Sequence, residues 1–218
     1  MGGEQLKPAV VLAGVFFLVF LCVAPGFVSA MDLDEFLTAV EAKAAPVNSF
    51  SCRFTQERHL AIFAKPVLFS GLLKMSRPRQ LRWEFLKPIP SVLALKGTTG
   101  LRCSNGRSQR FELAADPVIA SVVEQMWTWM DGSYRSLPQT WQIEYLPQAP
   151  GIRLVAKSAG VKAVMQAVRI SFDRTTLRPV EIEIIDSGGD RTVLAFSEYV
   201  INPLLAETIF SQCGPPAQ

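Results

Sequence analysis

The sequence predicts a mainly β domain with helices, of the α+β class. Three observations lead to this prediction: about ten short segments alternate apolar and polar residues, turn signals separate them, and two stretches have helical spacing. Because short turns join most of the segments, the strands are expected to run mostly antiparallel. One sheet of this size must curl, split into a sandwich or nearly close into a barrel.

A first helix is expected over residues 32–44. Asp32 and Glu35 have the N-cap and N3 spacing of a capping box, with Asp in place of the usual Ser or Thr. Apolar residues then recur at helical spacing, at Leu33, Phe36, Leu37, Val40 and Ala44. Pro46 ends the helix, which therefore has one apolar face.

The period changes to two after Pro46, which indicates strands. In the first half of the chain we expect strands over residues 50–55, 67–75, 81–85, 92–96 and 109–113, with a glycine-rich turn at 97–100. In the second half we expect them over 140–146, 151–157, 168–172, 180–184 and 191–199. One face of each strand is apolar and the other charged, so one face of the sheet is expected to meet water.

A second helix interrupts the strands at residues 117–130. Asp116 and Pro117 form a good start, because proline suits the first helical position. The apolar spacing follows Ile119, Val122, Val123, Met126 and Met130, with Trp127 and Trp129 nearby. Asp131 and Gly132 end the helix.

The first thirty residues have the order of a cleavable signal peptide. Lys7 precedes an uncharged apolar run from Pro8 to Val23, and Val28-Ser29-Ala30 offers the small residues of a cleavage site. The run is about 16 residues, shorter than the ~20 that span a membrane, although an uncleaved anchor is the alternative. We therefore expect a signal peptide at 1–30 and a single domain at 31–218.

Composition and cysteines narrow the function classes. The formal net charge is +3 and basic runs are short, so no nucleic-acid partner is expected. After export, Cys52, Cys103 and Cys213 allow one disulfide and leave one thiol over, and the sequence does not choose the pair. No metal-ligand spacing appears, so neither a metal nor another cofactor is expected.

No set of catalytic residues is present, and we expect a protein that is not an enzyme. The single histidine, His59, follows a strand and has no nucleophile pattern near it. The sequence contains no Gly-x-Ser-x-Gly, no phosphate-binding loop and no His-Glu-x-x-His.

Aromatic residues recur on the inner face of the predicted sheet. They are Phe50, Phe54, Trp83, Phe85, Trp141, Tyr145, Phe172 and Phe196. The pattern alone favours a filled core over a ligand cavity.

An ordered set of short motifs adds to this picture. The first strand ends with Phe54-Thr55-Gln56. Two further motifs are Gly71-Leu72-Leu73, which precedes Arg77-Pro78, and Arg82-Trp83-Glu84-Phe85, which leads into Pro88. The series closes near the end of the chain with Thr192, Phe196, Asn202 and Phe210. Over roughly residues 32–210 this series resembles the LolA family of periplasmic outer-membrane lipoprotein carrier proteins. The resemblance implies an unclosed antiparallel β-barrel of about ten or eleven strands with a short-helix lid, in the periplasm.

The resemblance also implies roles for residues. The acyl cavity would be lined by Phe50, Phe54, Trp83, Phe85, Trp141, Phe172 and Phe196. The lid would consist of Leu33, Phe36, Leu37, Val40, Ile119, Val122, Val123, Met126 and Met130. Arg77 would be the latch that hydrogen-bonds the lid and holds the empty form closed.

The implied function is a monomeric periplasmic carrier that shields lipoprotein acyl chains between the inner and the outer membrane. An inner-membrane release transporter would load it and an outer-membrane receptor would unload it. Residues 96–103 lack the Asp-Gly and the aromatic strand usual in the family, so a carrier of a free lipid, a glycolipid or another apolar molecule is an alternative. A lipid-sensing regulatory module on the same fold is an alternative of another class.

Overall fold

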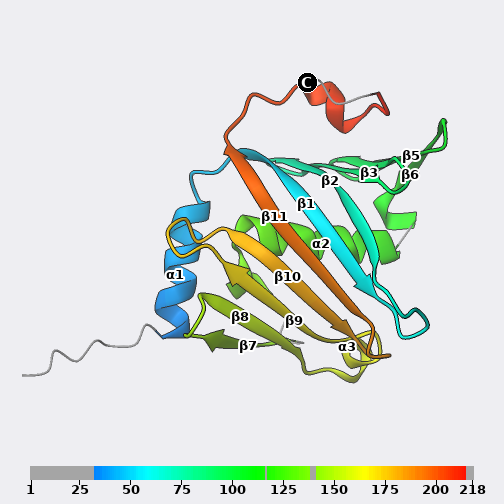
Figure 1. Ribbon diagram of the computed structural model, residues 1–218. Coiled ribbons are helices and arrows are strands. Elements are labelled where there is room, and N and C mark those ends of the chain that lie inside the picture. Colours follow the sequence, from blue (N-terminus) through cyan, green and yellow to red (C-terminus); the bar gives the residue numbers. More distant parts are fainter. Residues whose placement is uncertain (1–31, 116, 138–140, 215–218) are drawn as a thin grey trace, which may run out of the picture. The chain divides into compact units, whose positions relative to one another are not determined.

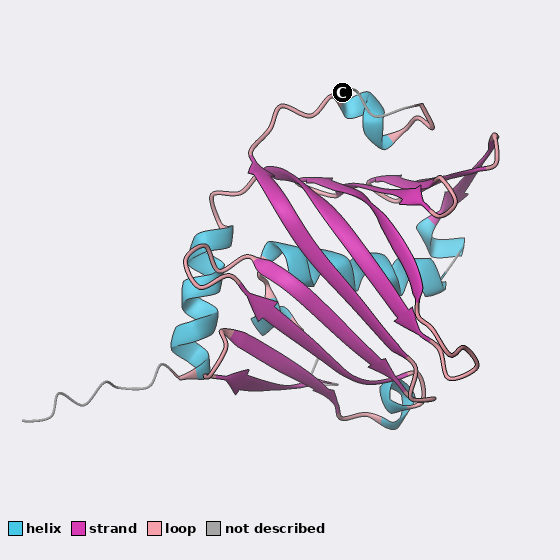
Figure 2. Ribbon diagram, viewed as in Figure 1, coloured by secondary structure: helices cyan, strands magenta, loops and turns pink. Residues whose placement is uncertain are grey.

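Eleven antiparallel strands form one sheet in the described part of the chain (Figures 1 and 2). The computed structural model describes residues 32–115, 117–137 and 141–214, apart from the side chains of residues 117, 118, 121 and 122. The predicted signal peptide, residues 1–30, lies outside these residues.

The order of strands across the sheet leaves it open. The first half contains β1 (Ser49–His59), β2 (Val67–Ser76), β3 (Gln80–Lys87), β4 (Ser91–Lys96), β5 (Thr99–Ser104) and β6 (Arg107–Glu112). The second half contains β7 (Trp141–Leu146), β8 (Gly151–Ala156), β9 (Met165–Phe172), β10 (Pro179–Asp186) and β11 (Arg191–Ile201). The order is β6-β5-β4-β3-β2-β1-β11-β10-β9-β8-β7, so β6 and β7 are the two edges. The predicted unclosed antiparallel barrel is confirmed.

One strand was not predicted. The sequence places a glycine-rich turn at residues 97–100, but β5 already begins at Thr99. Gly97 does have the positive φ of a turn residue, +64°. Gly100 instead pairs with Phe111 of β6, and a Cβ at Gly100 would lie 2.2 Å from that ring. The second glycine is therefore explained by close packing inside a hairpin.

Two longer helices pack on the inner face of the sheet. They are α1 (Leu33–Ala44) and α2 (Pro117–Asp131), and in Figure 1 α2 runs behind the strands while α1 stands to one side. The predicted capping box is confirmed, because the Glu35 backbone N–H donates to the Asp32 carboxylate at 2.8 Å. Shorter helices are α3 (Ala159–Lys162), η1 (Leu113–Ala115), η2 (Tyr134–Ser136) and η3 (Glu207–Phe210). Among the described residues, no helix has the length and apolar character needed to cross a membrane.

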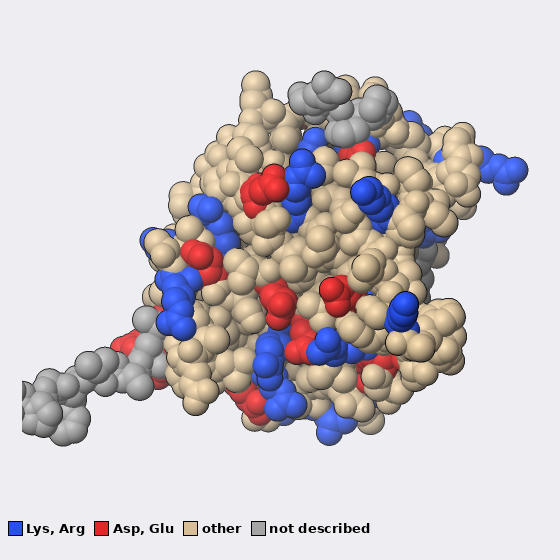
Figure 3. All heavy atoms as spheres, viewed as in Figure 1, with Lys and Arg blue, Asp and Glu red and all other residues tan. Residues whose placement is uncertain are grey.

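The outer face of the sheet meets water over part of its area. In Figure 3 acidic and basic side chains alternate on the visible face. Two of the ion pairs there join Arg53 to Glu198 at 2.8 Å and Arg191 to Glu183 at 3.0 Å. This part agrees with the expected charged face.

The outer face of β3, β4 and β5 differs from that expectation. Arg82 and Glu84 point outward, yet they are only 1% and 6% exposed. The C-terminal segment covers them: the Arg82 guanidinium donates to the carbonyls of Ile209, Gln212 and Gly214 at 2.8–2.9 Å and to the Glu84 carboxylate at 3.1 Å. Alternation places these two charges on the outer face, but it carries no information about a segment that follows more than a hundred residues later.

A disulfide fixes the same segment. Cys103 of β5 and Cys213 are bonded, and they are 110 residues apart in the sequence. Cys52 keeps a free thiol on the inner face. Burial raises the pKa of the Cys52 thiol to about 12, so this thiol stays protonated and unreactive at neutral pH.

The Arg82→Met variant tests the buried charges. Removal of the guanidinium leaves the Glu84 carboxylate buried without its partner, and we expect the free energy of unfolding to fall by about 3–5 kcal/mol. Urea unfolding of the purified domain measures this change. The matched control is Arg82→Met combined with Glu84→Leu, which removes both charges and should recover much of the loss; a double variant as unstable as the single one would contradict the argument.

Candidate functional site

An aromatic cluster occupies the inner face of β1, β2 and β3. The rings of Phe54 and Phe85 meet edge to face at 5.2 Å, and Trp83 stacks on Phe85 at 5.3 Å. Phe54 and Phe85 are two strands apart, with Gly71 of β2 between them. A Cβ at Gly71 would lie 2.8 Å from the Phe54 ring and 1.8 Å from the Glu84 carbonyl oxygen. Glycine at this position therefore lets the rings meet across the middle strand.

A second aromatic group joins α1 to the other half of the sheet. The Phe36 ring of α1 lies 5.4 Å from Phe172 and 4.8 Å from Tyr145. Tyr134 of η2 also meets Phe172 edge to face, at 5.7 Å. The helix and the strands thus share one continuous apolar interior.

The structure brings the predicted cavity residues and lid residues into this one interior. Of the predicted cavity lining, the buried residues are Phe50, Phe54, Phe172 and Phe196, and the half-buried ones are Trp83, Phe85 and Trp141. Of the predicted lid, the buried residues are Phe36, Leu37, Val40, Val123, Met126 and Met130, and the half-buried ones are Leu33 and Ile119. The side chain of Val122 lies outside the described residues.

Three large residues of this interior were not assigned to the lid from the sequence. Trp127 and Trp129 of α2 are 9% and 3% exposed, and Tyr134 is completely buried. The Tyr134 hydroxyl donates to the Trp129 carbonyl at 2.5 Å, which satisfies a carbonyl near the end of α2. The helical spacing of apolar residues in α2 could have included both tryptophans.

A small cavity lies where α1 and α2 meet the sheet. It is lined by residues that include Val40, Ala44, Phe50, Met75, Arg77, Trp127, Met130 and Leu177. Its volume is about 50 Å³, room for a few water molecules and too little for a long acyl chain. The two helices therefore fill most of the space that the resemblance assigns to lipid.

The predicted latch residue lies at this cavity. Arg77 follows β2, and its backbone N–H donates to the Asn48 carbonyl at 2.8 Å. Its side chain lines the cavity but makes no hydrogen bond with any residue that the structure describes. Its neighbour Arg79 forms an ion pair with Glu124 of α2. The latch role of Arg77 stays a prediction.

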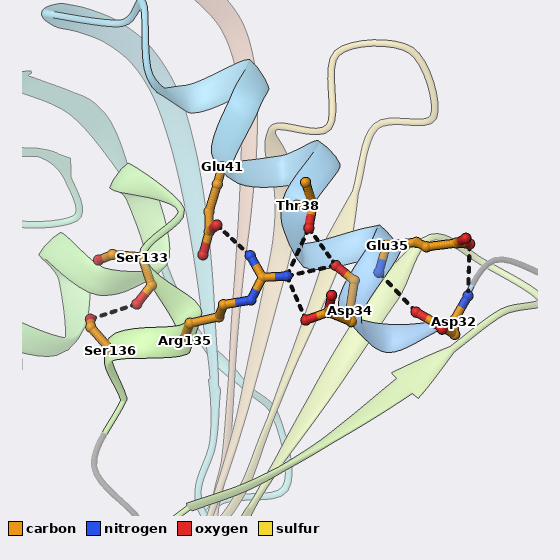
Figure 4. Close-up of polar contacts among 8 residues, drawn as sticks. All are labelled: Asp32, Asp34, Glu35, Thr38, Glu41, Ser133, Arg135 and Ser136. Carbon is orange, nitrogen blue, oxygen red and sulfur yellow. Dashed lines mark hydrogen bonds and ion pairs between the residues drawn. The ribbon is translucent and has the colours of Figure 1, made fainter.

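A further arginine ties α1 to the segment after α2 (Figure 4). The Arg135 guanidinium donates to the Asp34 carboxylate and carbonyl at 2.7 Å and to the Thr38 hydroxyl at 2.8 Å, and it also bonds Glu41. Hydrogen bonding to Asp34 raises the pKa of Arg135. Because Asp34, Thr38 and Glu41 share one side of α1, a single side chain of η2 bonds to three successive positions along that helix.

The described residues contain no group of three His, Cys, Asp or Glu side chains that could hold a metal ion. His59 lies at the end of β1, where its ring pairs with Glu57 at 3.2 Å.

The family assignment comes from comparison with known proteins. A family model described as "Outer membrane lipoprotein carrier protein LolA" matches residues 45–213. The chain belongs to the LolA family. This confirms the resemblance, and the family is one of carriers rather than of enzymes.

Curated relatives carry the same description. An outer-membrane lipoprotein carrier protein of Albidiferax ferrireducens is 28% identical over 159 residues, which are 68% of this chain and 70% of the relative. One from Dechloromonas aromatica is 29% identical over 154 residues, 70% of this chain and 71% of the relative. These similarities support a lipoprotein or lipid carrier role.

A solved structure supports the fold. The crystal structure of an uncharacterized conserved protein from Thermus thermophilus matches with a TM-score of 0.51 and 15% identity. The match covers 85% of this chain and 96% of that one. At this level of identity the likeness concerns the fold alone.

In this member of the LolA family, apolar contacts hold α2 on the sheet more strongly than its exposed ion pair does. The Arg79 and Glu124 side chains are 47% and 58% exposed, and an exposed pair of this kind contributes about 0–1 kcal/mol. A buried side chain such as Met126, only 2% exposed, contributes about 1.5–3 kcal/mol through burial.

Two substitutions in α2 separate these contributions. Met126→Ala should lower the free energy of unfolding by about 2–5 kcal/mol, because it leaves a cavity under the helix, and should speed the uptake of a fluorescent acyl probe. Glu124→Gln, the matched control on the same helix, should change stability by about 1 kcal/mol or less. Urea unfolding and stopped-flow fluorescence measure the two effects. A Glu124→Gln loss as large as that of Met126→Ala would show that the ion pair holds the helix.

Proposed function

We propose that this protein is a periplasmic carrier that shields the acyl chains of lipoproteins and moves them from the inner to the outer membrane. The observation that carries the proposal is the cover of the inner face. Helices α1 and α2, and not a second sheet, bury the aromatic face of an open sheet. A helix is not hydrogen-bonded into the sheet, so it can move off this face without breaking any strand pairing.

The free energies involved are of similar size. Burial of an acyl chain of about 16 carbons contributes of order 10 kcal/mol, at about 0.8 kcal/mol for each methylene. The six buried lid side chains together contribute a similar free energy, at about 1.5–3 kcal/mol each. An empty cavity of that size would be costly, because its lining would lack contacts. In the protein without cargo, the lid side chains contact the lining residues. In the loaded protein, the acyl chains make those contacts instead.

Location and partners belong to the same proposal. The apolar N-terminal stretch supports export, and the disulfide between Cys103 and Cys213 suits an oxidising compartment. The carrier works as a monomer. It receives cargo from an inner-membrane release transporter and delivers it to an outer-membrane receptor.

Native mass spectrometry of the domain purified from a periplasm tests the cargo. We expect an adduct with the mass of an acylated polypeptide. An adduct of lipid mass would instead favour the carrier of a free lipid. Neither an adduct nor uptake of a fluorescent acyl probe would mean that the aromatic face is a permanently filled core, and the proposal would be wrong.

Arg77→Leu tests the latch. The cavity at Arg77 lies between the ends of both lid helices, so a guanidinium there can reach lid carbonyls when the helices shift. We expect the variant to fold with an unchanged midpoint of unfolding but to lose transfer of a loaded lipopeptide to acceptor liposomes or receptor.

The matched control for the latch is Arg107→Leu, since Arg107 is exposed at the start of β6. It should transfer cargo normally. Normal transfer by the Arg77→Leu variant would remove Arg77 from the mechanism.

A further inference from the structure

Two buried polar side-chain atoms on the inner face have no hydrogen-bond partner among the residues that the structure describes. They are Nε1 of Trp83 on β3 and Oε1 of Gln56 on β1. Both side chains belong to the face that the proposed function assigns to acyl chains, because Gln56 follows Phe54 by two residues and Trp83 stacks on Phe85. Nearly all buried polar groups in folded proteins are paired, so two unpaired atoms on one face need an explanation.

Packing alone does not explain them. The neighbours of Trp83 in the aromatic cluster are Phe54 and Phe85, and a phenyl ring there would leave no N–H without a partner. Leucine is similar to glutamine in size, so it could fill the place of Gln56 next to Phe54. An unpaired buried donor or acceptor destabilises the empty protein. Both groups would lower the affinity of a ligand that is purely hydrocarbon, since they would remain unpaired against it.

The chemistry of the two groups indicates what they bind. The indole Nε1–H is only a donor, and the carboxamide can turn to present either its NH₂ or its oxygen. Carbonyl oxygens of ester or amide linkages match both groups, and an amide N–H also matches the carboxamide oxygen. These linkages are the polar groups that stand at the head of acyl chains.

The spacing of the two groups favours more than one linkage. Trp83 of β3 lies opposite Leu73 of β2, whereas Gln56 of β1 lies opposite Phe69 of β2. Leu73 and Phe69 are four residues apart along β2, which is about 13 Å. A cargo with two or more acyl chains offers separate linkages at separate positions.

We propose that Trp83 and Gln56 form a recognition site for the ester or amide linkages of a cargo that carries two or more acyl chains. The Trp83 N–H donates to one linkage carbonyl, and the Gln56 carboxamide pairs with a second linkage. This inference rests on the proposed carrier function and adds the class of ligand that the cavity selects.

The test compares two probes that differ in their carbonyl groups. Dioctanoylglycerol has two ester linkages, and its ether analogue dioctylglycerol has none. We expect the unaltered domain to bind the diester about tenfold or more tightly than the diether, measured by displacement of a fluorescent acyl probe, because two hydrogen bonds distinguish them. This comparison needs no variant.

Variants then assign the preference to residues. Trp83→Phe and Gln56→Leu should each weaken diester binding about three- to tenfold and leave diether binding unchanged. The double variant should bind both probes equally. Gln56→Leu, which nearly conserves side-chain volume, should keep or raise the thermal midpoint of the protein, because an unpaired buried atom has been removed. The matched control is Gln109→Leu, which removes the same carboxamide from an exposed position on β6 and should keep the full preference.

The outcomes separate this inference from the proposed function. Equal binding of the diester and the diether by the unaltered domain, or an undiminished preference in the double variant, would overturn the linkage site while the carrier function stands. Binding of neither probe would overturn the carrier function and this inference with it. A diacylated lipopeptide as a third probe separates the sources of the linkage: loss of its binding in the double variant assigns the site to lipoprotein cargo, and loss of diester binding alone assigns it to a free lipid.

Discussion

The apolar inner face of an unclosed sheet is the constraint on which the rest of this structure depends. Edge strands β6 and β7 do not pair, so the sheet cannot bury that face by closing on itself. Two helices supply the missing cover, and Phe36 and Met126 are among the side chains with which they do so. The helices meet the strands mainly through side-chain contacts, so under the proposed function they could leave the sheet without breaking its strand pairing.

The two faces of the sheet are held by different physical means. On the outer face, a disulfide and the buried Arg82 bind the C-terminal segment to β3, β4 and β5. On the inner face, dispersion and burial hold the helices, and the exposed ion pairs of Arg79 and Arg135 chiefly orient them. A covalent bond and buried polar contacts thus hold the cover of the outer face, whereas apolar contacts hold the cover of the inner face.

Most of the fold and much of the site could be predicted from sequence, because they depend on local periodicity. The capping box at Asp32, the helical spacing in α2 and the inward position of Trp83 all follow from residues within one or two turns. The missed features depend on distant segments. The burial of Arg82 requires a segment more than a hundred residues later. Strand β5 was not predicted because Gly100 has the appearance of a turn residue in the sequence, whereas it is a glycine that makes room for the Phe111 ring.

The unpaired polar atoms of Trp83 and Gln56 distinguish the helices from an acylated cargo as a cover for the inner face. A lid made of hydrocarbon and aromatic side chains can match the hydrocarbon of a cargo, but it cannot match the linkage carbonyls. Each unpaired atom therefore makes the empty, closed state slightly less stable than its apolar contacts alone would allow. In the proposed exchange, the same atom would gain a partner when an acylated cargo replaces the helices. Polar groups at these positions would then favour ligands with head linkages over plain hydrocarbon, because only the linkages offer hydrogen-bond partners.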